Sequence, residues 1–209
     1  MPNLPDSVAK APGRPRTTSR HEVQHIALRL FADQGFEKTT LDDIAASVGV
    51  SRRTLFRYYA SKNDIVWGEF GEHLDGLRAR LAAAPADEPL MEVLRRAVVA
   101  FNDYGEQELP ELRIRMTLIT TVPALQGHSM LRYRDWCEVI AEFVATRLEC
   151  DTHDHVPQVV ANAALGTAMA TYQHWISHPD VDLLEELDEA FRLLAAGFDE
   201  RLLAAQSRQ

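Results

Sequence analysis

Residues 49–64, GVSRRTLFRYYASKND, gather basic and aromatic side chains in a chain whose net charge is −9. Leu55 and Tyr59 stand four residues apart in this segment, the spacing at which side chains share one face of a helix. We therefore expect residues 51–59 to form a helix that buries these two side chains. The opposite face of that helix would then carry Arg52, Arg53 and Arg57.

Two further helices are expected ahead of this segment. Ser19 precedes Glu22 by three residues, and Thr40 precedes Asp43 by the same spacing, a pattern typical of helix starts. Apolar residues recur at helical spacing after each of these caps until a glycine ends the helix. The second of these helices ends at Gly49 and is followed directly by the third. Two short helices joined by a glycine-containing turn predict a helix-turn-helix.

The exposed face of the third helix has the chemistry to bind a DNA major groove. Arginine can donate two hydrogen bonds to guanine, threonine and phenylalanine can contact the thymine methyl, and tyrosine or lysine can reach phosphate. A run of charge can also be only a solvated surface. Because this one follows a capped helix and a glycine turn, we favour contact with nucleic acid. The residues expected to make that contact are Arg52, Arg53, Thr54, Phe56, Arg57 and Tyr58.

The charge is distributed unevenly along the chain. Residues 1–60 hold nine Lys/Arg against six Asp/Glu, a net charge of +3, whereas residues 61–209 hold thirteen against twenty-five, a net charge of −12. Only the first part is therefore expected to meet a polyanion. Residues 1–18 are rich in Pro, Gly and Ser/Thr and are expected to form a flexible basic arm. Its Arg14 and Arg16 could enter the minor groove of A/T-rich DNA, or the arm could be only a solubilising tail.

Beyond residue 60 every periodicity is helical, so we expect an all-α fold of about nine helices. A three-helix helix-turn-helix domain would span residues 19–64, and a larger ligand-binding and dimerisation domain residues 65–209. A cap at Ser61 and Asp64 opens a fourth helix that could extend ~36 Å as a lever. Further helices are expected at 88–104, 110–121, 123–150, 155–178 and 182–205.

Residues 19–64 resemble the DNA-binding domain of the TetR family of bacterial repressors. The pairs GF, TT and IA, the turn GVS and the segment YYASK stand at the spacing of that family. The resemblance implies that residues 51–59 are the recognition helix and that Thr40 and Lys62 contact phosphate. At Phe56 the family usually has tyrosine, so this chain lacks one hydroxyl that could reach phosphate.

A second resemblance covers most of the chain. The segments RRTLFRYYASKNDIVWGEF and VPALQGHSMLRYRDW are similar to the regulators encoded with the mycofactocin redox-cofactor system in actinobacteria. This resemblance implies a small-molecule effector of the long-chain acyl-CoA class. The aromatic and methionine side chains expected to bind it, unless they only fill the core, are Met116, Tyr133, Trp136, Phe143, Met169, Tyr172 and Trp175.

A cationic anchor for the effector is also expected in this domain. Arg113, Arg115 and His174 lie in otherwise apolar helices, so one of them could bind an anionic head group, and we select Arg113. Pairing with Glu138 or Glu142 would explain these cations equally well.

The last two helices carry stripes of small and apolar residues. From the pattern alone these stripes could be intramolecular core or a surface that binds a second copy, and small residues allow helices to approach closely. The family resemblance favours a two-fold homodimer built from both helices. The residues assigned to that interface are Ala161, Ala164, Ala168, Leu187 and Phe191.

Catalytic and metal motifs are not evident. The chain lacks a phosphate-binding glycine loop and a recognisable nucleophile turn, and its CDTHDH segment (residues 150–155) matches no standard zinc spacing, so we expect no enzyme activity, cofactor or metal. No signal peptide or apolar span of ~20 residues is present, which predicts a cytoplasmic protein without membrane association. Two classes stay open: a regulator that binds double-stranded operator DNA and, as the alternative, a helical enzyme or RNA-binding protein.

Overall fold

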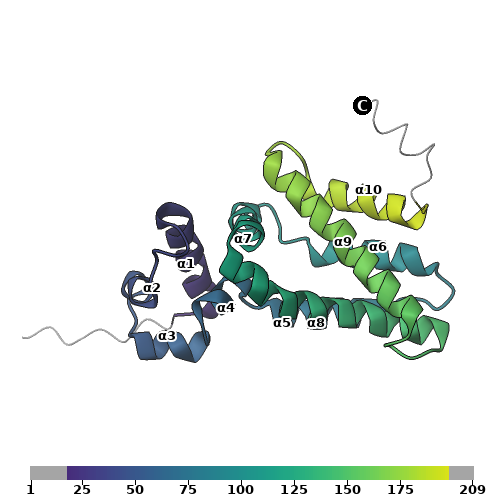
Figure 1. Ribbon diagram of the computed structural model, residues 1–209, viewed down its shortest axis with the longest axis horizontal. Coiled ribbons are helices and arrows are strands. Elements are labelled where there is room, and N and C mark those ends of the chain that lie inside the picture. Colours follow the sequence, from purple (N-terminus) through teal and green to yellow (C-terminus); the bar gives the residue numbers. More distant parts are fainter. Residues whose placement is uncertain (1–17, 198–209) are drawn as a thin grey trace, which may run out of the picture.

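The computed structural model describes residues 18–197, which fold into helices joined by turns and loops (Figure 1). No strand occurs in this range, and the all-α prediction is confirmed. None of the described helices is long and apolar enough to cross a membrane. The helices are α1 Arg20–Gln34, α2 Leu41–Val48, α3 Arg52–Tyr58, α4 Lys62–Trp67, α5 Phe70–Ala82, α6 Leu90–Phe101, α7 Leu109–Thr121, α8 Pro123–Leu148, α9 His155–Ser177 and α10 Leu183–Ala195.

The first three helices start where the sequence predicts. The Ser19 hydroxyl accepts a hydrogen bond from the Glu22 amide at 3.0 Å and caps α1. At α2 the Asp43 amide donates to the Thr40 hydroxyl at 3.1 Å, and the Thr40 amide donates to the Asp43 carboxylate at 2.8 Å. Gly49 then ends α2 in the left-handed conformation, with φ of 78°, and turns the chain toward α3.

Lys62 supports this helix-turn-helix from within. Its ammonium donates to the carbonyl oxygens of Phe36 at 2.7 Å and Thr39 at 3.1 Å, both in the turn between α1 and α2. The same ammonium lies 4.1 Å from the centroid of the Phe36 ring. We expected Lys62 to contact phosphate, but the structure uses two of its three N–H donors to hold that turn.

The expected long fourth helix is interrupted at Gly68. α4 ends at Trp67 and α5 begins at Phe70, with Gly68 at φ 57° and ψ −129° between them. A side chain at Gly68 would also meet Gln24 of α1, because its Cβ would lie 2.1 Å from the Gln24 Nε2. The prediction of one continuous lever is therefore wrong. Apolar periodicity continues across the break and conceals it.

Ionic contacts on two sides join the helix-turn-helix to the rest of the molecule. Asp64, at the start of α4, accepts a hydrogen bond from Arg132 of α8 at 3.3 Å, and His128 Nε2 of α8 lies 3.2 Å from the same oxygen. On the other side, the imidazole of His25 in α1 contacts the carboxylate of Glu111 in α7. The helix-turn-helix is thus attached to α7 and α8 as well as through the chain.

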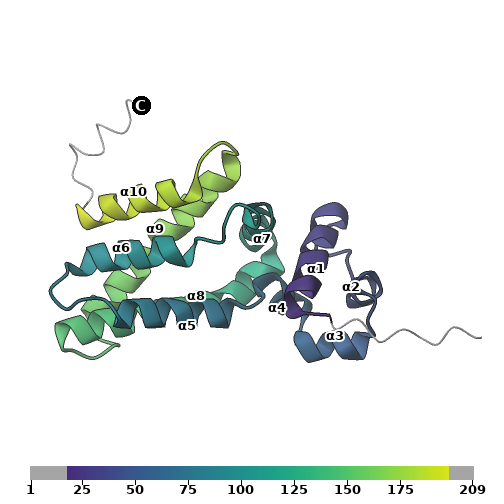
Figure 2. The same cartoon turned by 180° about the vertical axis from the view of Figure 1, so that it is seen from behind.

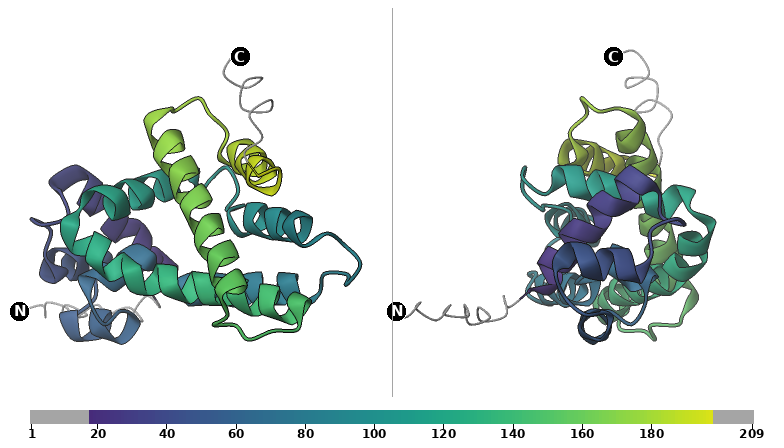
Figure 3. Two further views of the ribbon diagram at one scale, coloured as in Figure 1. Left: turned by 45° about the vertical axis from the view of Figure 1, so that its right-hand side comes forward. Right: turned by 90° about the vertical axis from the view of Figure 1, so that its left-hand side faces the viewer.

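The larger helical domain consists of α5 to α10. Figures 1 and 2 show α9 on one face of this domain and α5 and α6 on the opposite face, with the helix-turn-helix at one end. In Figure 3, left, α9 runs along the front of the molecule. Ile140 and Val144 of α8 and Trp175 of α9 are among the most buried side chains of the domain core.

The residues assigned to the dimer interface lie inside a single protomer. Ala161, Ala164, Leu187 and Phe191 are 0% exposed, and Ala168 is 5% exposed. The small side chains of α9 let α8 and α10 approach closely within one chain, which is the alternative that the sequence pattern left open. These five residues cannot form the surface that binds a second copy, so that assignment is wrong.

Candidate functional site

The outer face of α3 is a basic, solvent-exposed surface. Leu55 and Tyr59 are buried as expected, at 1% and 5% exposure, and they fix which way the helix faces. Arg52, Arg53 and Arg57 are exposed on the other side. Phe56 is 46% exposed on the same side, and the Arg52 guanidinium lies 5.7 Å from the centroid of its ring. The residues proposed to contact DNA from α3 therefore lie on one accessible face, except for Tyr58.

Tyr58 is oriented by the start of the described chain. Its hydroxyl donates to the Thr18 carbonyl oxygen at 2.6 Å, and the neighbouring Tyr59 hydroxyl donates to the Arg20 carbonyl oxygen at 3.0 Å. Tyr58 was assigned to the DNA-contacting face, but its hydroxyl instead fixes the segment that leads into α1. Arg14 and Arg16 of the basic arm lie outside the described residues.

Two further residues that the sequence assigned to DNA contact have protein partners. Arg52 donates to the Asp42 carboxylate of α2 at 3.0 Å, with both groups more than half exposed. Thr54 donates its amide to the Ser51 hydroxyl at 3.1 Å, which caps α3. An exposed ion pair of this kind contributes little stability, so Arg52 can exchange its partner at small cost.

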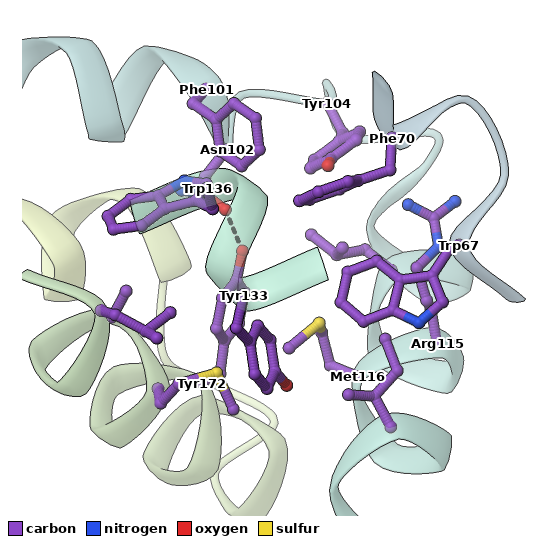
Figure 4. Close-up of a pocket in the computed structure, with 15 residues that line it drawn as sticks. Trp67, Phe70, Phe101, Asn102, Tyr104, Arg115, Met116, Tyr133, Trp136 and Tyr172 are labelled. Carbon is purple, nitrogen blue, oxygen red and sulfur yellow. Dashed lines mark hydrogen bonds between the residues drawn. The ribbon is translucent and has the colours of Figure 1, made fainter. Parts of the chain in front are cut away.

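The larger domain contains an apolar cavity of about 60 Å³ between α4, α5, α6, α7, α8 and α9 (Figure 4). Five of the residues that the sequence assigned to ligand binding line it: Met116, Tyr133, Trp136, Met169 and Tyr172. The volume is small compared with the ~300–1,000 Å³ typical of ligand pockets, so a large ligand could enter only if the helices separate.

Three other residues assigned to the ligand lie elsewhere. The Arg113 guanidinium stacks 4.0 Å from the centroid of the Trp175 ring and donates to the Trp175 and Ile176 carbonyl oxygens, so it binds the end of α9. Trp175 itself is 2% exposed and part of the core. Phe143 lines a different groove, between α5 and α8, next to Arg147. None of the three reaches the cavity, and their assignment is corrected accordingly.

Several lining residues were not assigned from the sequence. Trp67 and Phe70 flank the Gly68 break, which the continuous-helix interpretation concealed. Arg115 was considered as an anchor beside Arg113, but helical spacing alone could not choose between them. The remaining members are Phe101, Asn102, Tyr104, Leu112, Ile119, Leu165 and Ala168.

Polar atoms within the cavity wall are few and mostly paired. The Tyr172 hydroxyl donates to Asn102 Oδ1, and Asn102 Nδ2 donates to the Val98 carbonyl oxygen at 2.8 Å. Burial raises the pKa of the Tyr172 phenol well above its ordinary value of 10, and it also raises the pKa values of Tyr104 and Tyr133. These phenols are therefore neutral donors at physiological pH.

No metal centre is formed by the described residues. Within residues 18–197, no group of three or more His, Cys, Asp or Glu side chains is arranged to hold a metal ion. Cys150 is an exposed free thiol, and Cys137 is a buried one. Burial raises the pKa of Cys137 to about 11, so this thiol is protonated and unreactive at neutral pH.

Sequence comparison agrees with this geometry. Residues 25–66 match the model for bacterial regulatory proteins of the tetR family, and residues 88–199 match the MftR C-terminal domain. The protein named mycofactocin biosynthesis transcriptional regulator MftR, from Mycobacterium tuberculosis, is 46% identical over 187 residues, which are 90% of this chain and 94% of that protein.

The chain belongs to the TetR family of transcriptional regulators. Members of this TetR family are regulators and not enzymes. The regulator TcmR of Streptomyces glaucescens is 28% identical over 180 residues, covering 83% of this chain and 79% of that protein. The crystal structure of Thermus thermophilus FadR in complex with lauroyl-CoA shares the fold, with a TM-score of 0.59 and 24% identity over 85% of this chain and 93% of that one.

Alkaline pH should destabilise this TetR-family protein through its buried phenols. Burial raises the pKa of Tyr172 above 10 and that of Tyr59 to about 12, whereas both groups ionise near 10 in the unfolded chain. Their contribution to stability is complete below pH ~10 and is lost as the pH rises above it, because the unfolded chain then releases protons that the folded chain retains.

The melting temperature measured against pH should therefore fall above pH ~10, and it should fall less steeply in Tyr172→Phe. Tyr172→Phe also removes the hydrogen bond to Asn102 Oδ1, which lowers the melting temperature at every pH. The comparison is therefore between the slopes of melting temperature against pH in the two proteins. Parallel slopes in the two proteins would contradict the assignment to Tyr172.

Proposed function

We propose that this TetR-family regulator is a cytoplasmic repressor that binds a palindromic operator as a homodimer and is released by a long-chain acyl-CoA. The observation that carries the proposal is the pairing of two features in one chain. An exposed basic α3 face provides the DNA contact, and an apolar cavity shares its wall with the helix that follows α3.

The DNA contact rests on the outward side chains of α3. Arg53 is exposed and makes no ion pair with any described residue, so both edges of its guanidinium are available to a guanine. Arg52 would exchange its exposed pairing with Asp42 for a base or a phosphate. Thr40, at the start of α2, is exposed and remains the proposed phosphate contact, although its hydroxyl also serves the α2 cap.

Arg53→Ala should weaken binding to the true operator by ~1–3 kcal/mol and leave binding to unrelated DNA nearly unchanged. Arg53 should read a base, whereas sequence-independent affinity comes from phosphate contacts. The operator can be selected from random duplexes by the wild-type protein and used in fluorescence anisotropy. Arg134→Ala is the control, because Arg134 is also exposed but lies on α8. Equal losses on both DNAs would contradict base reading by Arg53.

The proposed dimer surface is the exposed side of α9. Val156 and Val159 are 52% and 50% exposed, and the same stripe continues through Ala163, Gly166 and Ala170. Small side chains on this side would let a second copy of α9 approach closely. Two recognition helices related by a two-fold axis would then contact an inverted repeat, with major-groove faces ~34 Å apart.

Gly166→Asp should convert the dimer to a monomer, because a close helix contact would bury an unpaired carboxylate. The matched control is Gly76→Asp, which places the same charge at an exposed helical glycine of α5, on the opposite face of the domain. Sedimentation velocity at micromolar concentration distinguishes the two. A Gly166→Asp protein that sediments as the intact wild-type assembly would place the interface elsewhere.

The proposed effector matches the lining of the cavity. Apart from Asn102 and Arg115, the wall is formed by aromatic, aliphatic and methionine side chains and three tyrosines whose rings are apolar. The FadR structure that shares this fold contains lauroyl-CoA, which supports the same ligand class here. An acyl chain inserted into the cavity must separate the helices that line it, including α4. Because α4 directly follows α3, this separation would also displace the helix-turn-helix.

Release from the operator should become more efficient as the acyl chain lengthens. A hundredfold loss of DNA affinity requires ~2.7 kcal/mol of coupling, and each buried methylene contributes ~0.8 kcal/mol. Titration of octanoyl-, dodecanoyl- and palmitoyl-CoA into an operator complex, followed by anisotropy, tests this. Free CoA serves as the control. Release that is independent of chain length, or equal release by free CoA, would reject the cavity as the effector site.

A further inference from the structure

Two buried N–H donors in the wall of the cavity have no hydrogen-bond partner. They are the indole Nε1 of Trp67 and the Nε of Arg115. Among the described residues, the one other buried side-chain atom in this condition is His128 Nε2, and it lies 3.2 Å from a carboxylate oxygen of Asp64. The unpartnered donors with no acceptor nearby are therefore concentrated at the cavity.

Both groups can only donate. An indole N–H and a guanidinium have no acceptor atom, and the guanidinium keeps its charge at any physiological pH. Proteins rarely leave such groups unpaired, and exceptions often mark functional sites. An oxygen with lone pairs is the group that would satisfy both.

The contrast with Arg113, two residues earlier on α7, is informative. Arg113 donates to backbone carbonyl oxygens at the end of α9, so its hydrogen-bonding groups stabilise the packing of α7 against α9. Arg115 has no carboxylate of the described residues within 4.0 Å of its guanidinium nitrogens. The fold therefore leaves part of the Arg115 hydrogen-bonding capacity available to a ligand.

The position of the two donors orients that ligand. Figure 4 shows Trp67 and Arg115 toward one side of the cavity and Trp136 toward the other. Arg115 also lines an adjoining polar cleft, together with Tyr104 and Leu112, which belong to both spaces. An apolar chain would thus extend toward Trp136, and its polar end would lie where the cavity meets the cleft.

The charge of the cleft restricts what that polar end can be. Glu69, Glu108 and Glu111 line the cleft with Arg115, and so do His21 and His73. Glu108 contacts His21, and Glu111 contacts His25. Three carboxylates that line the same cleft as a single arginine disfavour a multiply charged phosphate at this point, because like charges repel. A single carbonyl oxygen requires no such charge compensation and matches two N–H donors.

We propose that Trp67 Nε1–H and Arg115 Nε–H bind the carbonyl oxygen at the head of the effector's apolar chain. This inference rests on the proposed function, in which the cavity receives an acyl ligand, and it names the atoms that recognise the acyl group. The oxygen can belong to a thioester or to a carboxylate. Trp67 is the last residue of α4, so recognition of the carbonyl acts directly on the helix that joins the cavity to the DNA-binding unit.

The test compares palmitoyl-CoA with S-hexadecyl-CoA, a thioether that keeps the chain and the nucleotide but lacks the carbonyl oxygen. Binding of each to the full-length protein is measured by calorimetry. The wild type should prefer palmitoyl-CoA by about tenfold or more, equivalent to ~1.4 kcal/mol for two hydrogen bonds. Trp67→Phe and Arg115→Met should each reduce this preference severalfold.

Trp136→Phe is the matched control. It removes the same indole portion from the opposite wall, so it should weaken both ligands equally and leave their ratio unchanged. Should Trp67→Phe fail to fold, as judged by circular dichroism, Arg115→Met alone gives the answer. A wild-type ratio near one, or a ratio that neither variant changes, overturns the inference.

Two arms separate the remaining possibilities. Binding of palmitate identifies the source of the oxygen. If palmitate binds and Arg115→Met weakens this binding, the site accepts a carboxylate, whereas absence of palmitate binding assigns the thioester. Either result supports recognition of a carbonyl. Tight binding of both CoA compounds at a ratio of one overturns only this inference. Failure of both CoA compounds to bind overturns the proposed effector class as well, whereas operator binding would remain intact.

Discussion

The short helix α4 belongs to both the helix-turn-helix and the wall of the cavity. The position of each relative to the other therefore depends on the contacts that α4 makes. Lys62 at its start ties the turn between α1 and α2, and Ile65 and Val66 are fully buried. Trp67 at its end forms part of the cavity wall and packs edge-on against Phe70 and Tyr133, at centroid distances of 4.9 and 5.8 Å. This helix of 6 residues therefore contacts both the DNA-binding core and the cavity, so neither can move independently of α4.

The break at Gly68 determines how motion at the cavity can reach the DNA. A single rigid helix would transmit any displacement over its whole length, whereas two helices joined at a glycine can change their angle. Asp64 limits that change, because Arg132 and His128 of α8 both approach its carboxylate. A ligand alters operator affinity only if it binds one of two such arrangements better than the other, and contacts at Trp67 and on α8 provide that difference.

Local signals in the sequence predicted the helix-turn-helix well, whereas the cavity depended on contacts that no local pattern contains. The helix caps at Ser19 and Thr40 and the turn at Gly49 involve residues no more than four positions apart. The sequence alone could therefore predict them. Arg113 and Arg115 differ by about 200° around α7, and which one faces the cavity depends on where α9 packs. The alanines of α9 were ambiguous for a similar reason, because small residues suit a core and an interface equally well.

The small volume of the cavity is compatible with a large effector on energetic grounds. The fourteen methylenes of a sixteen-carbon acyl chain gain roughly 11 kcal/mol when fully buried, at ~0.8 kcal/mol each, whereas a hundredfold loss of DNA affinity needs only ~2.7 kcal/mol of coupling. Most of the burial energy can therefore offset the separation of α4, α7, α8 and α9. A cavity that was already wide would accept the chain without moving these helices, and the ligand would then bind both arrangements equally and shift neither. The collapsed, aromatic-lined cavity of about 60 Å³ is thus the form that couples binding to movement of the DNA-binding unit.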